Sequence, residues 1–111
     1  MRGYRKLYSD YYGIKFGREY SIHHIDGNRE NNDINNLLLL PSKLHNKYHF
    51  YKSIIDSWDK DTSLSSLYSN VYMMDAIKKF HDVCNECFLY YRIKVNLDRG
   101  APPEELGFDR K

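Results

Sequence analysis

Cysteine is scarce in this sequence, and long apolar runs are missing from it. Only two cysteines, Cys84 and Cys87, occur among the 111 residues, too few for a disulfide framework and half of a four-cysteine zinc site. No stretch approaches the roughly 20 apolar residues of a membrane-spanning helix, so we expect no membrane partner. The first residues are basic and tyrosine-rich and lack the apolar core of a secretory signal, which predicts a cytoplasmic location.

The sequence also lacks a large excess of charge of either sign. It has 17 Lys and Arg and 15 Asp and Glu, which gives a net charge of +2. The two signs are unevenly distributed. Residues 1–55 carry nine basic and five acidic residues, a net charge of +4, and residues 56–111 carry eight and ten, a net charge of −2. The first half is therefore the part that we expect to meet a polyanion, although an excess of this size is also common on solvated surfaces.

The length and the apolar periodicity predict one domain of the α+β class over residues 1–111. The predicted elements of its first half are a helix over 3–12, a strand over 20–25, a turn over 26–28, a loop over 29–36, a strand over 37–40 and a helix over about 43–58. Pro41 ends the second strand, and Ser42 is predicted to cap the helix that follows.

The second half is predicted to be largely helical. A polar linker over 59–66 precedes a helical pattern from residue 67 to about 95, with a break near Ser69 and Asn70. Cys84 and Cys87 lie on the apolar face of that pattern, which favours core residues over metal ligands. The predicted organisation is a core over about 19–58, a C-terminal helical extension over about 63–97 and an irregular tail over 98–111.

Four of the five histidines cluster around the predicted hairpin and helix. His23 and His24 lie in the first strand, and His45 and His49 lie in the helix. Residues four apart share one side of a helix, and this side is turned about 100° from the apolar stripe that we expect to face the core. Because neutral histidine is the commonest nitrogen ligand, imidazoles converging from these elements predict a divalent metal site.

Residues 20–49 carry an ordered pattern of several residue types. A His-His-Ile-Asp-Gly-Asn strand and turn is followed by an Asn-Leu dipeptide opening the second strand and by a histidine in the next helix. His24, Asn36 twelve residues later and His45 a further nine residues on give the order H, N, H. In this pattern the sequence resembles the HNH endonucleases of the ββα-metal superfamily, especially the small bacteriophage forms.

The resemblance implies a ββα-metal core of hairpin and helix, flanked by N-terminal and C-terminal helices, that acts as a metal-dependent DNA endonuclease in a bacterial host cell. It assigns His24 as the general base and Asn36 as the residue that crosses the hairpin loop to hold His24 or its backbone. His23 and His45 resemble the metal ligands, with His49 as a third. Mg²⁺ or Mn²⁺ is the expected single ion, and Zn²⁺, Ni²⁺ and Co²⁺ also suit imidazole ligands.

Successive side chains of a strand point to opposite faces, so His23 and His24 can serve one site only where strand pairing ends. Asp26 is interpreted as a turn residue rather than a metal ligand. Four cations surround the motif and are predicted to contact DNA phosphates, each with a solvated surface charge as the alternative: Arg29, Lys43, Lys47 and Lys52.

The expected activity is nicking or cleavage of low specificity, because no base-reading motif is present. Two other functions stay open at this point. One is a non-catalytic nucleic-acid-binding or assembly module with a structural metal, and the other is a nuclease that acts on RNA. A homodimer and a viral protein partner are also left open.

Overall fold

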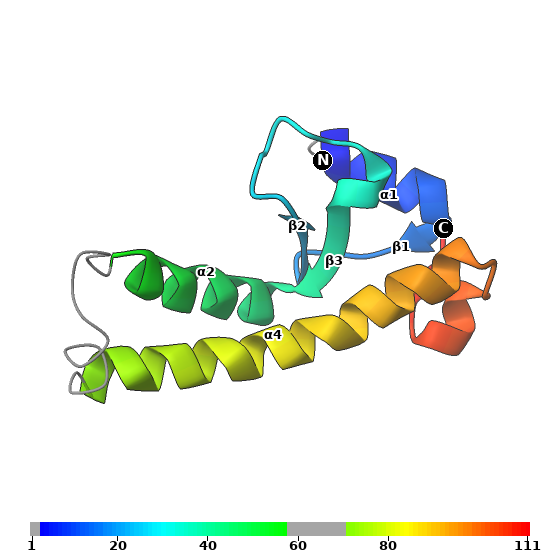
Figure 1. The fold of residues 1–111 in the computed structure, drawn as a ribbon. Helices are drawn as coiled ribbons and strands as arrows, with labels where there is room; N and C mark the ends of the chain where they lie inside the picture. Colours follow the sequence, from blue (N-terminus) through cyan, green and yellow to red (C-terminus); the bar gives the residue numbers. More distant parts are fainter. Residues whose placement is uncertain (1–2, 58–70) are drawn as a thin grey trace.

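The computed structural model describes residues 3–57 and 71–111 (Figure 1). Its helices and strands in chain order are α1 Gly3–Tyr12, β1 Ile14–Lys15, β2 Tyr20–His24, β3 Leu37–Pro41, α2 Ser42–Asp56, α4 Val71–Asp98 and β4 Asp109–Arg110. Two 3₁₀ helices add to them, η1 Ile34–Asn36 before β3 and η2 Pro103–Leu106 before β4. The predicted α+β class and the order of hairpin and helix are confirmed.

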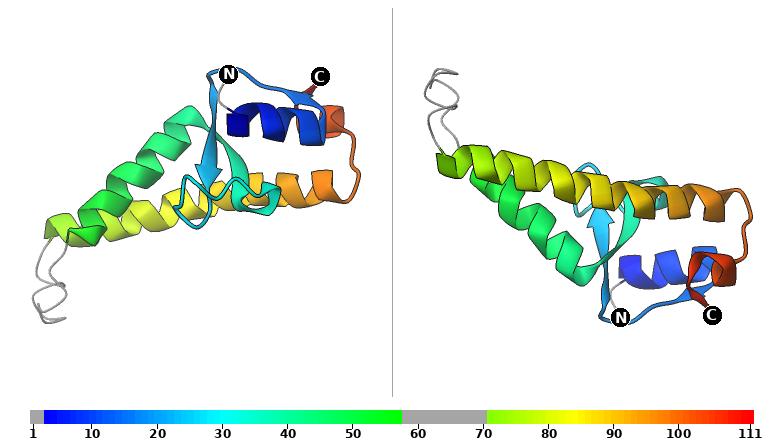
Figure 2. Two further views of the ribbon diagram at one scale, coloured as in Figure 1. Left: turned by 90° about the horizontal axis from the view of Figure 1, so that it is seen from above. Right: turned by 90° about the horizontal axis from the view of Figure 1, so that it is seen from below.

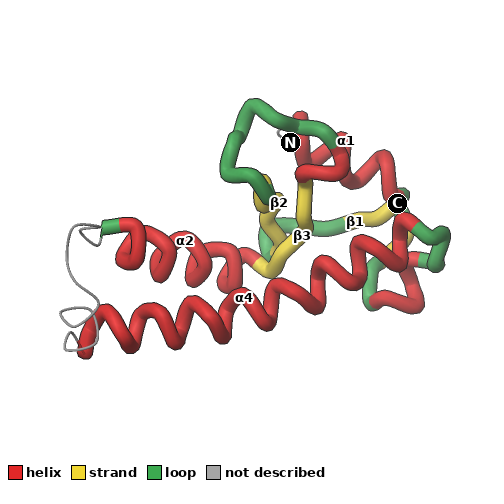
Figure 3. Tube along the Cα trace, viewed as in Figure 1, coloured by secondary structure: helices red, strands yellow, loops and turns green. Residues whose placement is uncertain are grey.

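The centre of the fold is an antiparallel hairpin followed by a helix. β2 pairs with β3 from Tyr20 opposite Pro41 to His24 opposite Leu37. The loop between the strands ends in η1, and α2 begins directly after β3 (Figure 3). The hairpin and α2 together form the ββα unit that the sequence predicts.

β3 is buried on both faces, which explains its continuous run of leucines. Leu37 and Leu39 join a core with Tyr8 of α1 and with Phe108 near the C-terminus. Leu38 and Leu40 join a second core, which includes Leu44 of α2 and Val83 of α4. Alternating side chains of one strand therefore connect the N-terminal helix and the C-terminal segment to the α2–α4 pair.

α4 has 28 residues and so is about 42 Å long. It packs along α2, contacts β3, and continues past the hairpin toward α1 and the C-terminal segment (Figure 2). None of the helices within residues 3–57 and 71–111 has the length and apolar character needed to cross a membrane.

The structure corrects the predicted cap of α2. Pro41, not Ser42, is the N-cap residue, and no side chain caps this end of the helix. The Ser42 hydroxyl instead donates to the Arg18 carbonyl oxygen at 2.7 Å and lies 2.7 Å from the Ser21 hydroxyl. Ser42 therefore ties the start of α2 to the strand beside it.

Helix ends and the tail also differ from the predictions. α2 ends at Asp56, and α4 continues to Asp98, beyond the predicted end near residue 95. The predicted end of the 43–58 helix, the linker 59–66 and the break near residues 69 and 70 lie outside the described residues. The tail predicted as irregular forms η2 and β4. This segment is ordered by the burial of Phe108 and by the pairing of β4 with β1. Its proline and glycine content does not predict either contact.

Candidate metal and catalytic site

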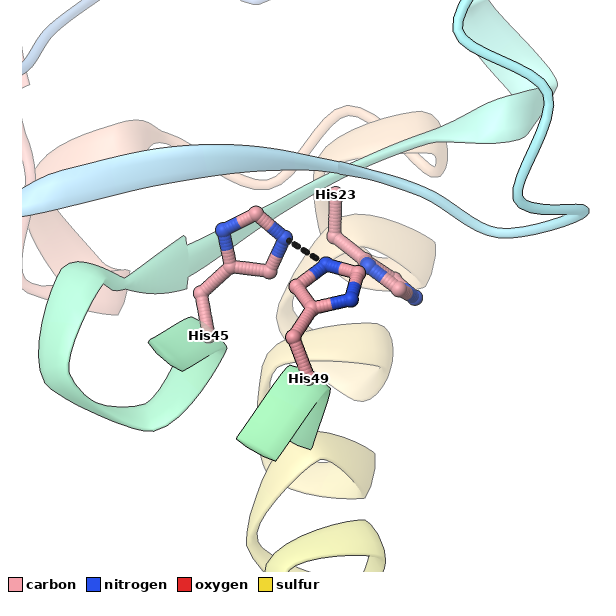
Figure 4. Close-up of side chains that lie close together, drawn as sticks. All are labelled: His23, His45 and His49. Atoms are coloured by element: carbon pink, nitrogen blue, oxygen red, sulfur yellow. Dashed lines mark hydrogen bonds between the residues drawn. The ribbon is translucent and has the colours of Figure 1, made fainter. Parts of the chain in front are cut away.

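Three histidines from two elements gather on the α2 side of the hairpin. The ring centroid of His23 lies 5.3 Å from that of His45 and 5.7 Å from that of His49. The Nε2 atoms of His45 and His49 are 2.8 Å apart (Figure 4). One ring nitrogen from each of the three residues lies within 4.8 Å of the others. We call these three residues the histidine triad.

The chemistry of the histidine triad fits a divalent metal ion. His23 Nδ1 is buried and has no hydrogen-bond partner within the described residues, which is unusual for a buried polar atom. Burial, and then the neighbouring His45 and His49, lower the pKa of His23 to about 4. Burial, and then His49 and Arg29, likewise lower the pKa of His45 to about 4. The rings are therefore neutral near pH 7, which is the form that binds metal.

His24 lies on the opposite face of β2, beside α1. Its ring meets the Tyr4 ring edge to face, with centroids 5.0 Å apart. Its Nε2 atom lies 2.8 Å from Asn32 Oδ1 in the hairpin loop. His24 and the histidine triad nevertheless line one open cavity of about 300 Å³.

Asn36 organises the chain that follows His24, and its side-chain hydrogen bonds within the described residues go to Asp26 and Asn31 rather than to the His24 ring. Its Oδ1 accepts from the Asp26 backbone N–H at 3.0 Å, and its Nδ2 donates to Asp26 Oδ1 and to the Asn31 carbonyl oxygen, both at 2.9 Å. Its own carbonyl oxygen accepts from the Ile25 N–H at 2.9 Å. The amide thus uses donor and acceptor together to fix the loop at the end of β2.

Asp26 is a turn residue in the structure, as predicted. Its Oδ1 accepts from the Asn28 N–H at 2.8 Å, and its Oδ2 accepts from Asn31 Nδ2 at 2.9 Å. The hydrogen bonds from Asn31, Asn28 and Asn36 lower the pKa of this carboxyl group. Its oxygens are occupied by the loop, and it is not part of the histidine triad.

Residues 8–47 match the family model described as HNH endonuclease. This match supports the resemblance to the HNH endonucleases that the sequence predicts. The matched segment contains the hairpin, His23, His24, Asn36 and His45, and it ends two residues before His49. No curated protein and no solved structure matches the chain.

The four predicted cations have different surroundings. Arg29 is exposed, lines the cavity with the histidines, and has no ion-pair partner in the described part of the chain. Lys52 lines a neighbouring cavity, but its Nζ lies 2.6 Å from Asp56 Oδ2. Lys43 and Lys47 are exposed on α2 and line neither of these two cavities.

The sequence predictions missed three residues of the site. Tyr4 and Arg5 line the cavity with the histidines, and Asn32 contacts His24. The Arg5 guanidinium donates to the carbonyl oxygens of Tyr20 at 2.9 Å and Gly17 at 2.8 Å, so it is fixed by backbone. Tyr4 fits the helical spacing of core residues, and Asn32 is one of many polar residues in its loop. Neither position carries a sequence signal that separates it from its neighbours.

Proposed function

We propose that this protein is a metal-dependent endonuclease that hydrolyses phosphodiester bonds of DNA, with one divalent ion held by His23, His45 and His49. The match of residues 8–47 to the HNH endonuclease family model supports nuclease chemistry and a nucleic-acid substrate. The observation that carries the proposal is the shared cavity, in which His24 stands beside the histidine triad without belonging to it.

Hydrolysis needs a group that accepts a proton from the attacking water and positive charge near the leaving 3′ oxygen. His24 is the proton acceptor in this proposal, because its ring reaches the cavity from the face opposite the triad. A divalent ion bound to the triad supplies Lewis-acid stabilisation of negative charge. Asn36 holds the loop after His24, and thereby keeps the end of β2 in position.

Arg29 is the cation best placed to bind a phosphate next to the cleaved one. It lines the same cavity, and its charge is not neutralised by a neighbouring carboxylate within the described residues. Lys52 is balanced by Asp56, and its contribution to binding is correspondingly smaller. With one active site per chain, the expected product is a nicked duplex with a 5′ phosphate and a 3′ hydroxyl.

Cleavage of supercoiled plasmid DNA tests the proposal. We expect the wild-type protein to nick the plasmid with Mg²⁺ or Mn²⁺, and His24→Ala to be about 10²–10⁴ times slower because the proton acceptor is lost. His81→Ala is the matched control, since His81 is exposed on α4 and outside the triad. It should cleave like the wild type, and the circular dichroism spectra of all three proteins should agree at the assay temperature.

The proposal fails if the wild-type protein leaves the plasmid intact with Mg²⁺, Mn²⁺, Co²⁺, Ni²⁺ and Zn²⁺ in turn. A labelled structured RNA in parallel reactions distinguishes the substrate. Cleavage of that RNA much faster than duplex DNA would reassign the enzyme to RNA. Metal binding without cleavage of either substrate would favour a non-catalytic module.

A further inference from the structure

The His24 ring contacts two residues that the sequence pattern did not assign to the site. Asn32 Oδ1 lies 2.8 Å from His24 Nε2, and the Tyr4 ring meets the His24 ring at 80°, with centroids 5.0 Å apart. Tyr4 comes from α1 and Asn32 from the hairpin loop, so the ring is held by two separate parts of the chain. His24 is only 8% exposed.

We propose that Asn32 is the positioning residue of His24, which fixes its ring with the hydrogen on Nε2 and leaves Nδ1 free to accept a proton. An amide oxygen only accepts hydrogen bonds. The 2.8 Å contact therefore requires that Nε2 carries hydrogen. A neutral imidazole has one N–H, so Nδ1 then keeps its lone pair. The catalytic consequence of this inference rests on the proposed nuclease function.

The same contact also stabilises the ring after it accepts a proton. When Nδ1 takes a proton from water, the imidazole becomes a cation and its Nε2–H becomes a stronger donor. The Asn32 oxygen is already in place to accept that stronger hydrogen bond. Tyr4, on the other contact, restricts rotation of the ring away from this geometry.

Asn36 supports this arrangement indirectly. Its side-chain amide is occupied by Asp26 and by the Asn31 carbonyl oxygen, so it is not the group that orients the ring. The bond to Asn31 fixes the backbone immediately before Asn32. The structure thus separates two roles, with Asn36 holding the loop and Asn32 holding the ring.

The surroundings of Asn32 make the inference testable. Asn32 is exposed, and the contact with His24 is its one side-chain hydrogen bond within the described residues. Its replacement should therefore leave the fold intact. Asn32→Leu removes the acceptor oxygen and keeps a side chain of similar size, and Asn32→Asp keeps an oxygen at the Oδ1 position. Asn35→Leu, at another exposed asparagine before β3, is the matched control.

The first measurement is independent of catalysis. The ¹⁵N chemical shifts of the His24 ring report which nitrogen carries hydrogen, and they are recorded on metal-free protein at about pH 8.5, where imidazoles are neutral. His24→Gln identifies the signals. We expect the Nε2–H form in the wild type, in Asn32→Asp and in Asn35→Leu. In Asn32→Leu the two shifts should move toward those of an unrestrained imidazole.

The second measurement is plasmid cleavage. Loss of an outer hydrogen-bond partner typically reduces activity about 10–100-fold, so we expect a fall of that size in kcat for Asn32→Leu. KM and the melting temperature should stay at the wild-type values, and Asn32→Asp should restore most of kcat. If Asn32 had only a structural role, Asn32→Leu would lower the melting temperature, and the Oδ1 atom kept in Asn32→Asp would not restore kcat.

The outcomes separate this inference from the proposed function. Wild-type kcat in Asn32→Leu, or unchanged His24 shifts in that variant, overturns the inference while cleavage by the wild type supports the nuclease. If the wild type cuts no substrate but Asn32→Leu changes the His24 shifts as expected, the proposed function fails and the assignment of the tautomer to Asn32 is supported.

Discussion

His23 and His24 are consecutive in β2 and face opposite sides of the hairpin, yet both line the same cavity. His23 is paired with Leu38, whose side chain lies in the core with α2 and α4, and His24 is paired with Leu37, in the core with α1. The last pair of the ladder is His24 with Leu37, so the sheet ends where the cavity opens. Strand alternation thus places the proposed metal ligand His23 and the proposed proton acceptor His24 on opposite faces, one residue apart.

The histidine triad predicts that a divalent ion binds and stabilises the folded protein. Titration with Zn²⁺ or Co²⁺ should raise the melting temperature, since an ion at 100 times its Kd stabilises by about 2.7 kcal/mol. His49→Ala should weaken binding by more than the roughly 10–100-fold expected for an outer partner, because it removes a ring of the triad. Calorimetry measures both, with His81→Ala as control. Unchanged affinity in His49→Ala would remove His49 from the ligand set.

Arg29 should contribute to substrate binding rather than to folding. Its side chain is exposed at the cavity, so Arg29→Gln should weaken DNA binding while the melting temperature stays constant. Losing one phosphate contact reduces the slope of log affinity against log salt by about 1. Binding of a labelled duplex at several salt concentrations measures this slope. Arg99→Gln, directly after the end of α4, is the control and should leave the salt slope unchanged. An equal effect of both variants would mean that the loss of any positive charge weakens DNA binding, and would contradict a specific contact by Arg29.

The ion pair between Lys52 and Asp56 should limit DNA binding. Lys52 Nζ and Asp56 Oδ2 are 2.6 Å apart, and both residues line a cavity next to the histidines. Asp56→Asn removes the carboxylate and leaves Lys52 uncompensated, so DNA should bind more tightly and with a steeper salt dependence. Stability should change little, because exposed ion pairs contribute about 0–1 kcal/mol. Asp75→Asn breaks the similar pair with Lys79 on α4 and is the control. Equal affinity of Asp56→Asn and wild type would contradict the prediction.

The sequence predicts the local elements of the site well, because their signals are local. The leucine run ended by Pro41 marks β3, and the spacing of His45 and His49 places both on one side of α2. The paired histidines and the Asp-Gly-Asn turn mark the end of β2. Each of these features depends on residues within a few positions of one another, so periodicity and turn chemistry are sufficient.

The contacts that the sequence does not predict join distant positions. Asn32 of the hairpin loop and Tyr4 of α1 both contact His24. Phe108, near the C-terminus, packs in the same core as Tyr8 of α1. The cap of α2 was predicted wrongly because Ser42 bonds instead with Arg18, 24 residues away. Such pairings depend on tertiary packing, which no local pattern of residue types encodes.

Lys94 is a buried charge that connects α4 to the chain just before Asn36. It is 4% exposed, and its Nζ donates to the Ile34 carbonyl oxygen at 2.6 Å and to the Tyr12 hydroxyl at 3.2 Å. The ammonium also lies 5.3 Å from the centre of the Tyr8 ring. Burial lowers the pKa of Lys94. The helix outside the family-matched segment therefore supports η1 and, through it, the loop that Asn36 holds.

Lys94→Met keeps most of the side-chain volume but leaves the Ile34 carbonyl oxygen without its charged donor. An unsatisfied buried polar group costs about 1–3 kcal/mol, and we expect a loss of that size in urea unfolding. Amide exchange at Asn36, whose N–H donates to the Asp33 carbonyl oxygen at 2.8 Å, should become faster. Lys78→Met, at an exposed position of the same helix, should change neither quantity. If Lys94→Met is as stable as wild type and exchange at Asn36 is unchanged, α4 does not stabilise the loop through this residue.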